Sequence, residues 1–480
     1  MKRILLFICL SVVLIGCKDK FTEEQQANVD INEWIYDNMS MLYYWNEKLP
    51  TYRKSYDYPA DYFRTLMNKE DRFSNIFDDY QEIINALNGI SSSEIGFDFQ
   101  LYRETAKNDN LLAFVLYVKP GTHAAQQGIQ RGDMFRKLNG TQLTIQNYQD
   151  LFNTFTDESS EVWVTFANYS YGEFIDLPPT RVRKIANYVE NPIYLDTVYQ
   201  VGNNKLGYLM YNSFVNDPGD ESMQYDLELN DAFGRFKQEN INYLIVDLRY
   251  NRGGLVTSAI HLASMMVPQL TEDKVFSYTQ FNKIYTDYFN SNEYKSKYSD
   301  DPTVSHFVDK IITNSSQPLE VPINNVGNQL QVIYFLTSSR TASASELVIN
   351  GLKPYINCVL IGDTTVGKNV GSTLVYDQLN VNNRWAFLPI IMKSFNSEHK
   401  SDYNYGFAPN IKKDDDYFNQ LGDTDEAMLG TAIAHINGQS QPNYRINSVL
   451  PLGSPFSPIR LDDRHHGLVI EIKDSKFLKK

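Results

Sequence analysis

The 480-residue sequence has few cysteines, fewer basic than acidic residues, and no long apolar run after its first sixteen residues. Three cysteines are too few for a disulfide framework in a chain of this length. The 58 Asp and Glu against 44 Lys and Arg give a formal charge of −14, which disfavours nucleic acid and anionic lipid headgroups as partners. Without a later apolar run, the rest of the chain is not expected to cross a membrane.

The N-terminus has the pattern of a secretion signal. "MKR" is cationic, and "ILLFICLSVVLIG" is apolar but too short to span a bilayer comfortably. The ending Leu14 to Cys17 resembles the lipobox of bacterial lipoproteins, which implies removal of residues 1–16 and lipidation of Cys17. An ordinary secretion signal with an incidental cysteine is the alternative. Cys9 would leave with the signal, and Cys358, within the apolar "INCVLIG", is expected to be a small core residue.

This interpretation predicts a lipid-anchored protein in the cell envelope of a bacterium, held at the outer membrane and facing the periplasm or the surface. The polar stretch "KDKFTEEQQ" that follows Cys17 suits a flexible tether. The membrane partner would therefore be reached through the Cys17 lipid, and the oligomeric state stays open.

The rest of the chain is long enough for two or three domains, and 42% hydrophobic residues can supply their cores. We divide it into a tether and N-terminal helical region (17–88), a domain at 89–188, a core at 189–440 and a tail at 441–480. Apolar residues recur at helical spacing between residues 29 and 49, which predicts an amphipathic helix: Ile31, Trp34, Ile35, Met39 and Leu42.

Residues 89–188 contain the strand-like runs "GFDFQLY" and "LLAFVLYV", then a Pro-Gly turn, a short helix and an Asn139-Gly140 hairpin signal. This order resembles a PDZ domain of the bacterial type. Such domains add an extended peptide to a sheet edge and hold its carboxylate on backbone N–H groups. "EIGF" stands where that family has its carboxylate-binding loop, so the resemblance makes Ile95, Gly96 and Phe97 candidate donors. A spacer or gate that binds no peptide is the alternative.

Turn contacts are the expected role of Arg131 and Asp133 in the same domain.

Strand-like and helix-like segments alternate from residue 189 to 440, which predicts a layered α/β core. "DLRYNRGG", residues 247–254, ends a strand and opens a helix. Its paired glycines, Gly253 and Gly254, let the backbone approach a ligand and aim N–H groups at an anion. No Gly-Lys-Ser/Thr follows, so an oxyanion site is favoured over a nucleotide site. Asp247 and Arg249 are expected to brace the turn.

A polar stretch rich in Tyr and Asn, within residues 277–326, has weak periodicity. It is either a surface excursion or a lid over a site.

The stretch "SSRTASASEL", residues 338–347, follows the strand-like "QVIYFLT". Ser343 and Glu346 have the spacing of a helix capping box, which is its simplest interpretation. Ser343 could also be a nucleophile at the positive end of a helix dipole. Lys368 lies 25 residues later, beyond a helix and a return strand. Burial among apolar neighbours would lower its pKa from roughly 10.4 toward neutrality, so that the amine could accept the serine proton.

"DLRYNRGG", "TSSRTASASEL" and "GDTTVGK", in this order after a PDZ-like segment, resemble the carboxyl-terminal processing protease family, also called tail-specific proteases. The resemblance covers roughly residues 89–412 and ends with "YGFAPNI". It implies a crotonase-like α/β core and a serine–lysine dyad with Ser343 as nucleophile and Lys368 as general base. The oxyanion hole would come from the N–H of Gly253 or Gly254 and of Ala344.

Two positions depart from the family pattern. Arg252 stands where the family commonly has Pro before the glycine pair. Ser372 stands where a glutamine often orients the lysine, and its hydroxyl has a shorter reach.

The expected function is therefore that of a serine endopeptidase that hydrolyses peptide bonds in protein or peptide substrates, with PDZ-like capture or gating of substrate C-termini. A catalytically inactive peptide-binding lipoprotein is the alternative from another class. The histidines lack a metal-binding framework, so no metal is assigned and no cofactor is expected.

Overall fold

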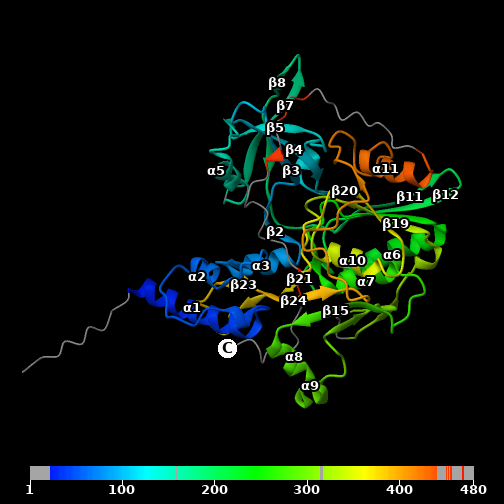
Figure 1. Cartoon of the computed structure of the whole chain (residues 1–480). Coiled ribbons are helices and arrows are strands. Elements are labelled where there is room, and N and C mark those ends of the chain that lie inside the picture. The colour runs from blue at the N-terminus through cyan, green and yellow to red at the C-terminus, as the bar shows by residue number, and fades with distance from the viewer. Residues whose placement is uncertain are drawn as a thin grey trace, which may run out of the picture.

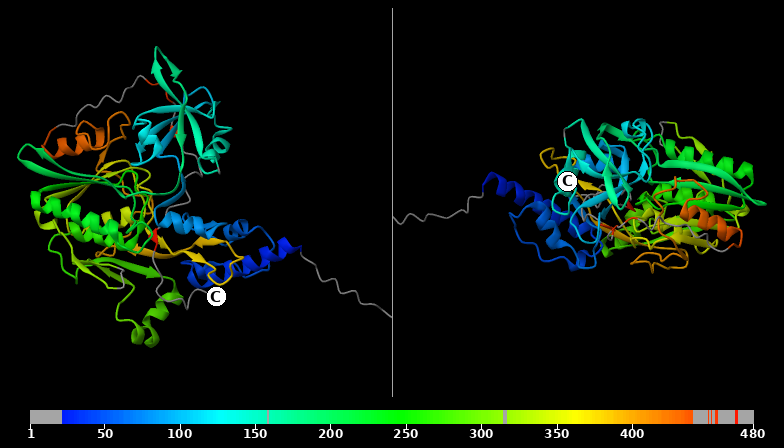
Figure 2. Two further views of the ribbon diagram at one scale, coloured as in Figure 1. Left: turned by 180° about the vertical axis from the view of Figure 1, so that it is seen from behind. Right: turned by 90° about the horizontal axis from the view of Figure 1, so that it is seen from above.

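The computed structural model describes residues 22–157, 159–313 and 317–439, together with 450, 452, 455–456 and 468–469. The predicted signal segment, the lipidation site Cys17 and most of the tail lie outside the described residues. Within these ranges, no helix combines the length and apolarity that a membrane crossing needs. Figure 1 shows a group of N-terminal helices, a small β domain and a larger α/β core, and Figure 2 shows the same three parts from behind and from above.

The N-terminal region contains the helices α1 (Glu23–Leu42), α2 (Pro59–Leu66) and α3 (Tyr80–Leu87). Helix α1 begins at a capping box between Thr22 and Gln25, six residues before the predicted start, because the cap satisfies N–H groups that the first turn leaves open. The predicted apolar stripe is confirmed, since its C-terminal members Ile35, Met39 and Leu42 are fully buried. The region also packs against the small sheet β1-β23-β22, formed by Asn75–Phe77, Ala386–Leu388 and Val375–Tyr376.

The small β domain, residues 89–188, has its own apolar core and a sheet of order β26-β3-β4-β5-β7-β8. Its two ends meet where β2 (Ile90–Glu94) pairs with β10 (Ile185–Val189). The predicted Asn139-Gly140 hairpin joins β5 to β6, and both residues adopt the positive φ that such a turn requires. The other elements are β3 (Phe97–Arg103), β4 (Leu111–Val118), α4 (His123–Gln126), β5 (Met134–Leu138), β6 (Thr141–Gln142), α5 (Tyr148–Phe152), β7 (Glu161–Ser170), β8 (Glu173–Asp176), β9 (Thr180–Arg183) and β26 (Pro455–Phe456).

The core contains a six-stranded sheet of order β11-β12-β13-β19-β20-β25, parallel from β12 onward. Helices α6 (Gln224–Glu239), α7 (Val256–Met266) and α10 (Ala344–Leu352) pack on one face, and α11 (Ala427–Ile436) packs on the other. The predicted α/β alternation is confirmed. The strands are β11 (Ile193–Val201), β12 (Asn204–Tyr211), β13 (Tyr243–Asp247), β19 (Val332–Thr337), β20 (Cys358–Gly362) and β25 (Ile411–Lys412).

A second sheet has the order β14-β27-β21-β24-β15-β16. Its strands are β14 (Gly254–Leu255), β27 (Leu468–Val469), β21 (Val370–Ser372), β24 (Ile390–Phe395), β15 (Val275–Phe281) and β16 (Val304–His306). The stretch 277–326 continues from β15 through α8 (Lys283–Asn290) and α9 (Asn292–Lys297) to the hairpin β17 (Lys310–Ile312) and β18 (Glu320–Pro322). Figure 1 shows α8 and α9 at the end of the molecule opposite the small β domain, which favours a surface excursion.

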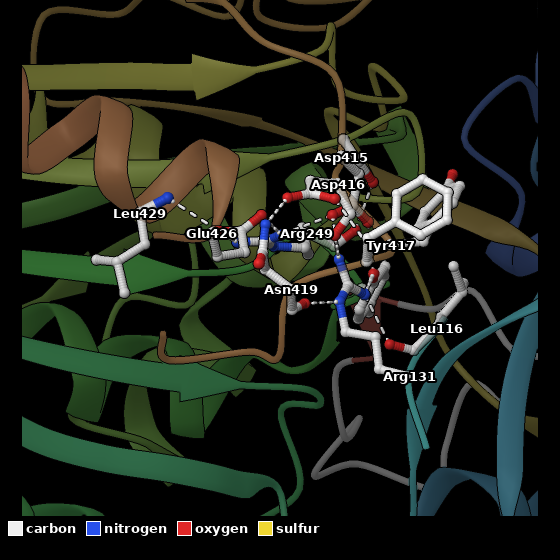
Figure 3. Close-up of polar contacts among 12 residues, drawn as sticks. Leu116, Arg131, Arg249, Asp415, Asp416, Tyr417, Asn419, Glu426 and Leu429 are labelled. Carbon is white, nitrogen blue, oxygen red and sulfur yellow. Dashed lines mark hydrogen bonds and ion pairs between the residues drawn. The ribbon is translucent and has the colours of Figure 1, made fainter. Parts of the chain in front are cut away.

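Arg249 lies at the centre of a buried ion network behind the "DLRYNRGG" turn (Figure 3). Its side chain is fully buried and pairs with Asp247 at 2.8 Å, Asp415 at 2.7 Å and Glu426 at 2.8 Å. Burial acts to raise the pKa of Asp415, but the charges of Arg131 and Arg249 lower it to about 2. The expected bracing role of Asp247 and Arg249 agrees with these contacts.

Arg131 departs from its expected role in a turn. It reaches from the small β domain into the same network, where it pairs with Asp415 at 2.6 Å and donates to the hydroxyl of Tyr250 at 2.6 Å. It also donates to the main-chain oxygens of Leu116, Asp416 and Asn419. Asp133 does make the expected turn contact, accepting from the Gln130 N–H. Arg131 therefore joins the small β domain to the core.

We expect Arg249→Met to lower the free energy of unfolding by about 3–5 kcal/mol, because it leaves Asp247 and Glu426 buried without their cation. The matched control is Arg64→Met, whose side chain is 55% exposed and pairs with Asp61; it should change stability by less than about 1 kcal/mol. Urea unfolding followed by circular dichroism measures both. Equal stability of the two variants would contradict the structural role of the network.

Candidate active site

Ser343 ends the loop between β19 and α10, immediately before the first helical residue, Ala344. Its φ of +61° lies in the left-handed region that favours glycine, so the backbone stores strain of about 1–3 kcal/mol. The side chain is 1% exposed, and its Oγ has no hydrogen-bond partner among the described residues. The predicted capping-box arrangement of Ser343 and Glu346 is present, and its hydrogen bond runs from the Ser343 N–H to the Glu346 carboxylate at 2.9 Å. The hydroxyl is thus left for another partner.

The glycine pair packs directly against Ser343. A Cβ on Gly253, whose φ is +107°, would lie 2.7 Å from the Ser343 Cβ and 3.0 Å from the Ala344 nitrogen, so only glycine fits. The Gly253 N–H donates to the side-chain oxygen of Asn251 at 2.8 Å. Among the predicted oxyanion donors, the Gly253 N–H is therefore already bound to Asn251 within the turn. Gly254 and Ala344, the latter in the first turn of a helix where N–H groups lack intrahelical partners, are the better candidates.

Glu346 joins the serine turn to the lysine loop. One carboxylate oxygen accepts from the Ser343 N–H and from the Lys368 N–H at 2.8 Å. The other accepts from the Gly367 N–H at 2.7 Å and from the Thr365 hydroxyl at 2.5 Å. Burial raises the pKa of this carboxyl, and the four donated bonds oppose that rise. The sequence identified Glu346 only as a cap.

Lys368 is 1% exposed. Burial lowers the pKa of its amine to about 8, while the negative charges of Asp71 and Glu346 act in the opposite direction. Its Nζ also lies 5.4 Å from the ring centroid of Phe73. The direction of the shift agrees with the sequence-based expectation, and a substantial fraction of the amine is neutral near pH 8.

The N-terminal region supplies part of the lysine environment, which the sequence did not indicate. Arg72 donates to the Gly367 carbonyl at 3.1 Å and to the Asn404 carbonyl at 2.7 Å. Asp71 accepts from the Tyr43 hydroxyl at 2.7 Å, which fixes its carboxylate. Arg72 and Gly367 are 295 residues apart, so no local pattern relates the two segments.

Ser372 is fully buried in β21, four residues after Lys368. Its strand neighbours are Ile390 of β24 and Val469 of β27. Its predicted role in orienting the amine stays a prediction.

The candidate carboxylate loop holds a carboxylate of this chain. The Gly96 N–H donates to Glu94 at 2.7 Å, and the other Glu94 oxygen pairs with Lys119 at 2.7 Å. A side chain thus engages one of the three predicted donors, Ile95, Gly96 and Phe97. Their role in binding a substrate C-terminus stays a prediction.

The strand that follows this loop contacts the serine loop through Arg340. The guanidinium donates to the Asp98 carboxylate, the Phe99 carbonyl and the Gln100 side chain, each at 3.0 Å. The edge of β3 and the nucleophile loop are therefore in direct contact.

The residues with metal-ligating side chains do not converge. Among the described residues, no group of three or more His, Cys, Asp or Glu side chains could hold a metal ion. His261 instead contacts the Asp226 carboxylate through Nδ1 at 2.6 Å. Burial raises the pKa of the free Cys358 thiol to about 12.

Replacing Asp71 with Asn should lower the Lys368 pKa further below its wild-type value of about 8, because the carboxylate stabilises the ammonium form. Asn keeps an oxygen for the N–H groups of Phe73 and Ser74. The titration is read from ¹³C shifts of labelled lysine side chains. Asp377→Asn is the control, since Asp377 also accepts from two loop N–H groups. A Lys368 pKa that rises in the Asp71 variant would contradict the charge assignment.

Comparisons with known proteins agree with this arrangement. The model for peptidase family S41 matches residues 205–413, and the model for the S41 N-terminal domain matches residues 30–75. A CtpA-like serine protease of Staphylococcus aureus (strain COL) is 22% identical over 286 residues, which are 59% of this chain and 46% of the relative. The chain thus spans about half the length of the curated relatives it matches.

One solved structure supports the fold. An S41 protease structure from Bacteroides fragilis aligns with a TM-score of 0.66 and 23% identity, over 84% of this chain and 97% of that one. The photosystem II D1 C-terminal processing protease aligns with a TM-score of 0.47 and 16% identity, over 86% and 99%. The family model spans Ser343, Lys368 and the glycine pair, and the N-terminal model spans Asp71 and Phe73. The chain belongs to peptidase family S41, the carboxyl-terminal processing proteases.

Proposed function

We propose that this chain is a serine endopeptidase that uses Ser343 as nucleophile and Lys368 as general base. The observation that carries the proposal is the Glu346 carboxylate, which binds the N–H groups of both residues at once. A second tie joins the same two loops, because the Val366 N–H donates to the Thr341 carbonyl at 3.0 Å. Backbone hydrogen bonds thus tie the loop that carries the buried hydroxyl to the loop that carries the buried amine.

In the proposed reaction, neutral Lys368 takes the proton of Ser343 as the Oγ forms a bond to the scissile carbonyl carbon. The N–H groups of Ala344 and Gly254 stabilise the oxyanion, at the positive end of the α10 dipole. The ammonium returns its proton to the leaving amine as the peptide C–N bond breaks. Water then hydrolyses the acyl-enzyme. Ser372 would accept a hydrogen bond from the amine and keep it in place.

Capture of substrate would fall to the small β domain. An extended peptide could pair with the edge of β3 opposite β4, as PDZ domains bind their ligands. Through its contacts to Asp98, Phe99 and Gln100, Arg340 would couple peptide binding at β3 to the serine loop. A lipid at Cys17 would hold the enzyme on the cell envelope, where protein or peptide substrates reach it.

Ser343→Ala and Lys368→Ala should each lower kcat/KM for a fluorogenic peptide library by at least about 10³-fold, because either change removes a member of the dyad. Circular dichroism should stay unchanged. Ser258→Ala is the matched control: Ser258 is equally buried in the same core and donates to Asp226. It should keep activity within about threefold. Full turnover by either dyad variant would refute the mechanism, and a serine-directed fluorophosphonate should label wild type at Ser343.

The proposal also sets the pH dependence. Lys368 acts in its neutral form, so kcat/KM should rise about tenfold per pH unit below pH 8 and level off above it. Lys368→Arg should stay inactive across the range, because a guanidinium does not release its proton. Peptide cleavage is measured from pH 5.5 to 9.5 at constant ionic strength. Activity that is flat from pH 6 to 9 would exclude Lys368 as the base.

A further inference from the structure

The C-terminal segment returns to the small β domain. Strand β26 runs antiparallel to β3, with Phe456 opposite Leu101 and Pro455 opposite Tyr102. The Gln100 side chain donates to the Phe456 carbonyl at 3.3 Å. The Phe456 ring packs on the apolar core of the domain and meets the Tyr148 ring of α5 edge-on, with centroids 5.2 Å apart. Figure 1 shows this short strand beside β3.

This position is the one that a peptide ligand would take. One edge of β3 pairs with β4, and β26 adds to the other edge as a further strand. In its antiparallel register, β26 runs from Pro455 to Phe456 in the direction of the N-terminal end of β3, where Ile95, Gly96 and Phe97 form the candidate carboxylate loop. Phe456 supplies the apolar anchor, seated between the strand and α5.

A second stretch of the same segment lies at the candidate active site. Leu468 pairs with Gly254, and Val469 pairs with both Leu255 and Ser372. Strand β27 thus fills the position between β14 and β21. One of these strands follows Gly253, which packs against Ser343, and the other follows Lys368.

A substrate carbonyl must come within about 3 Å of both the nucleophile and the oxyanion donors. A peptide backbone beside Gly254 meets that demand, and β27 is a backbone in this position. Eleven residues separate Phe456 from Leu468 in the sequence, so both short strands belong to one stretch of the C-terminal segment.

We propose that the C-terminal segment is an intramolecular inhibitor that occupies both peptide-binding edges of its own chain, through Pro455–Phe456 at β3 and Leu468–Val469 between β14 and β21. Its action at the second edge rests on the proposed function. Each contact is only two residues long, and a hydrogen bond contributes about 1 kcal/mol net, so neither is strong alone. Tethering raises the effective concentration of the segment toward the millimolar range, which keeps the edges filled until a substrate competes.

The first experiment measures binding and needs no catalysis. The probe is a fluorescein-labelled peptide with the sequence of residues 450–461, "LPLGSPFSPIRL". Its anisotropy is followed on full-length Ser343→Ala protein, on the same protein with Phe456→Asp, and on the same protein with Leu379→Asp. Leu379 is 67% exposed and lies in the loop between β22 and β23, which makes it the matched control.

We expect about tenfold tighter binding by the Phe456→Asp protein, because a segment that occupies β3 nine-tenths of the time weakens the apparent affinity tenfold. The control should bind as weakly as the parent protein. Equal affinity of all three proteins would overturn occupation of β3. This binding measurement does not depend on peptide cleavage. A failure of the inhibitor proposal can therefore be distinguished from a failure of the proposed function.

The second experiment leaves every described residue in place. A recognition sequence for a sequence-specific protease is inserted within residues 440–449 of the otherwise wild-type chain, and folded protein is cut there and diluted. Loss of the tether should release the segment, so KM for peptide cleavage should fall at least fivefold while kcat is retained. Mock-treated protein is the control.

Three results would overturn the inhibitor. A fall in kcat after cutting, with KM unchanged, would indicate that β27 is a structural strand that completes the sheet and not an inhibitor. Release of a fragment containing Phe456 by uncut wild type, but not by Ser343→Ala, would make the segment a substrate; mass spectrometry of incubated protein detects it. Unchanged KM after complete separation of the segment would also refute the proposal.

Discussion

The candidate site depends on one buried carboxylate. Glu346 is fully buried, and a charge removed from water is tolerated only when donors replace the lost hydration. The chain supplies four, three from backbone N–H groups and one from Thr365. Because the donors come from the serine turn and the lysine loop, neither loop can move without leaving the carboxylate unsatisfied. The strained φ of Ser343 is held by the same constraint.

Two buried cations in this fold show opposite uses of charge. Arg249 is surrounded by Asp247, Asp415 and Glu426, which keep it charged and make it part of the frame. Lys368 is buried to about the same degree, near Phe73, and there burial outweighs the attraction of Asp71 and Glu346 and lowers its pKa. Three surrounding carboxylates favour the charged form of Arg249, whereas burial disfavours the charged form of Lys368. The difference separates a structural cation from a candidate base.

Local and periodic features were predictable from the sequence. The apolar stripe of α1, the α/β alternation, the Asn139-Gly140 hairpin and the serine at a helix start each leave a pattern within a few residues. Contacts between distant segments leave no such local pattern. The sequence predicts a turn contact for Arg131, but its side chain binds Asp415. Asp71 belongs to the predicted N-terminal helical region, but its charge acts on the pKa of Lys368. The binding of Gly253 to Asn251 depends on a φ that the sequence does not specify.

The strand position between β14 and β21 also bears on how substrates would be selected. A peptide that enters there replaces one set of backbone hydrogen bonds with another, and such bonds are the same for every sequence. The net gain is therefore small, and recognition needs a second attachment elsewhere. Under the proposed function, the edge of β3 would provide this second attachment, because it lies beside the Tyr148 ring and contacts the serine loop through Arg340. Under the proposed function, two weak, linked sites would favour extended chain ends over folded surfaces, because each site would bind a peptide as an added strand.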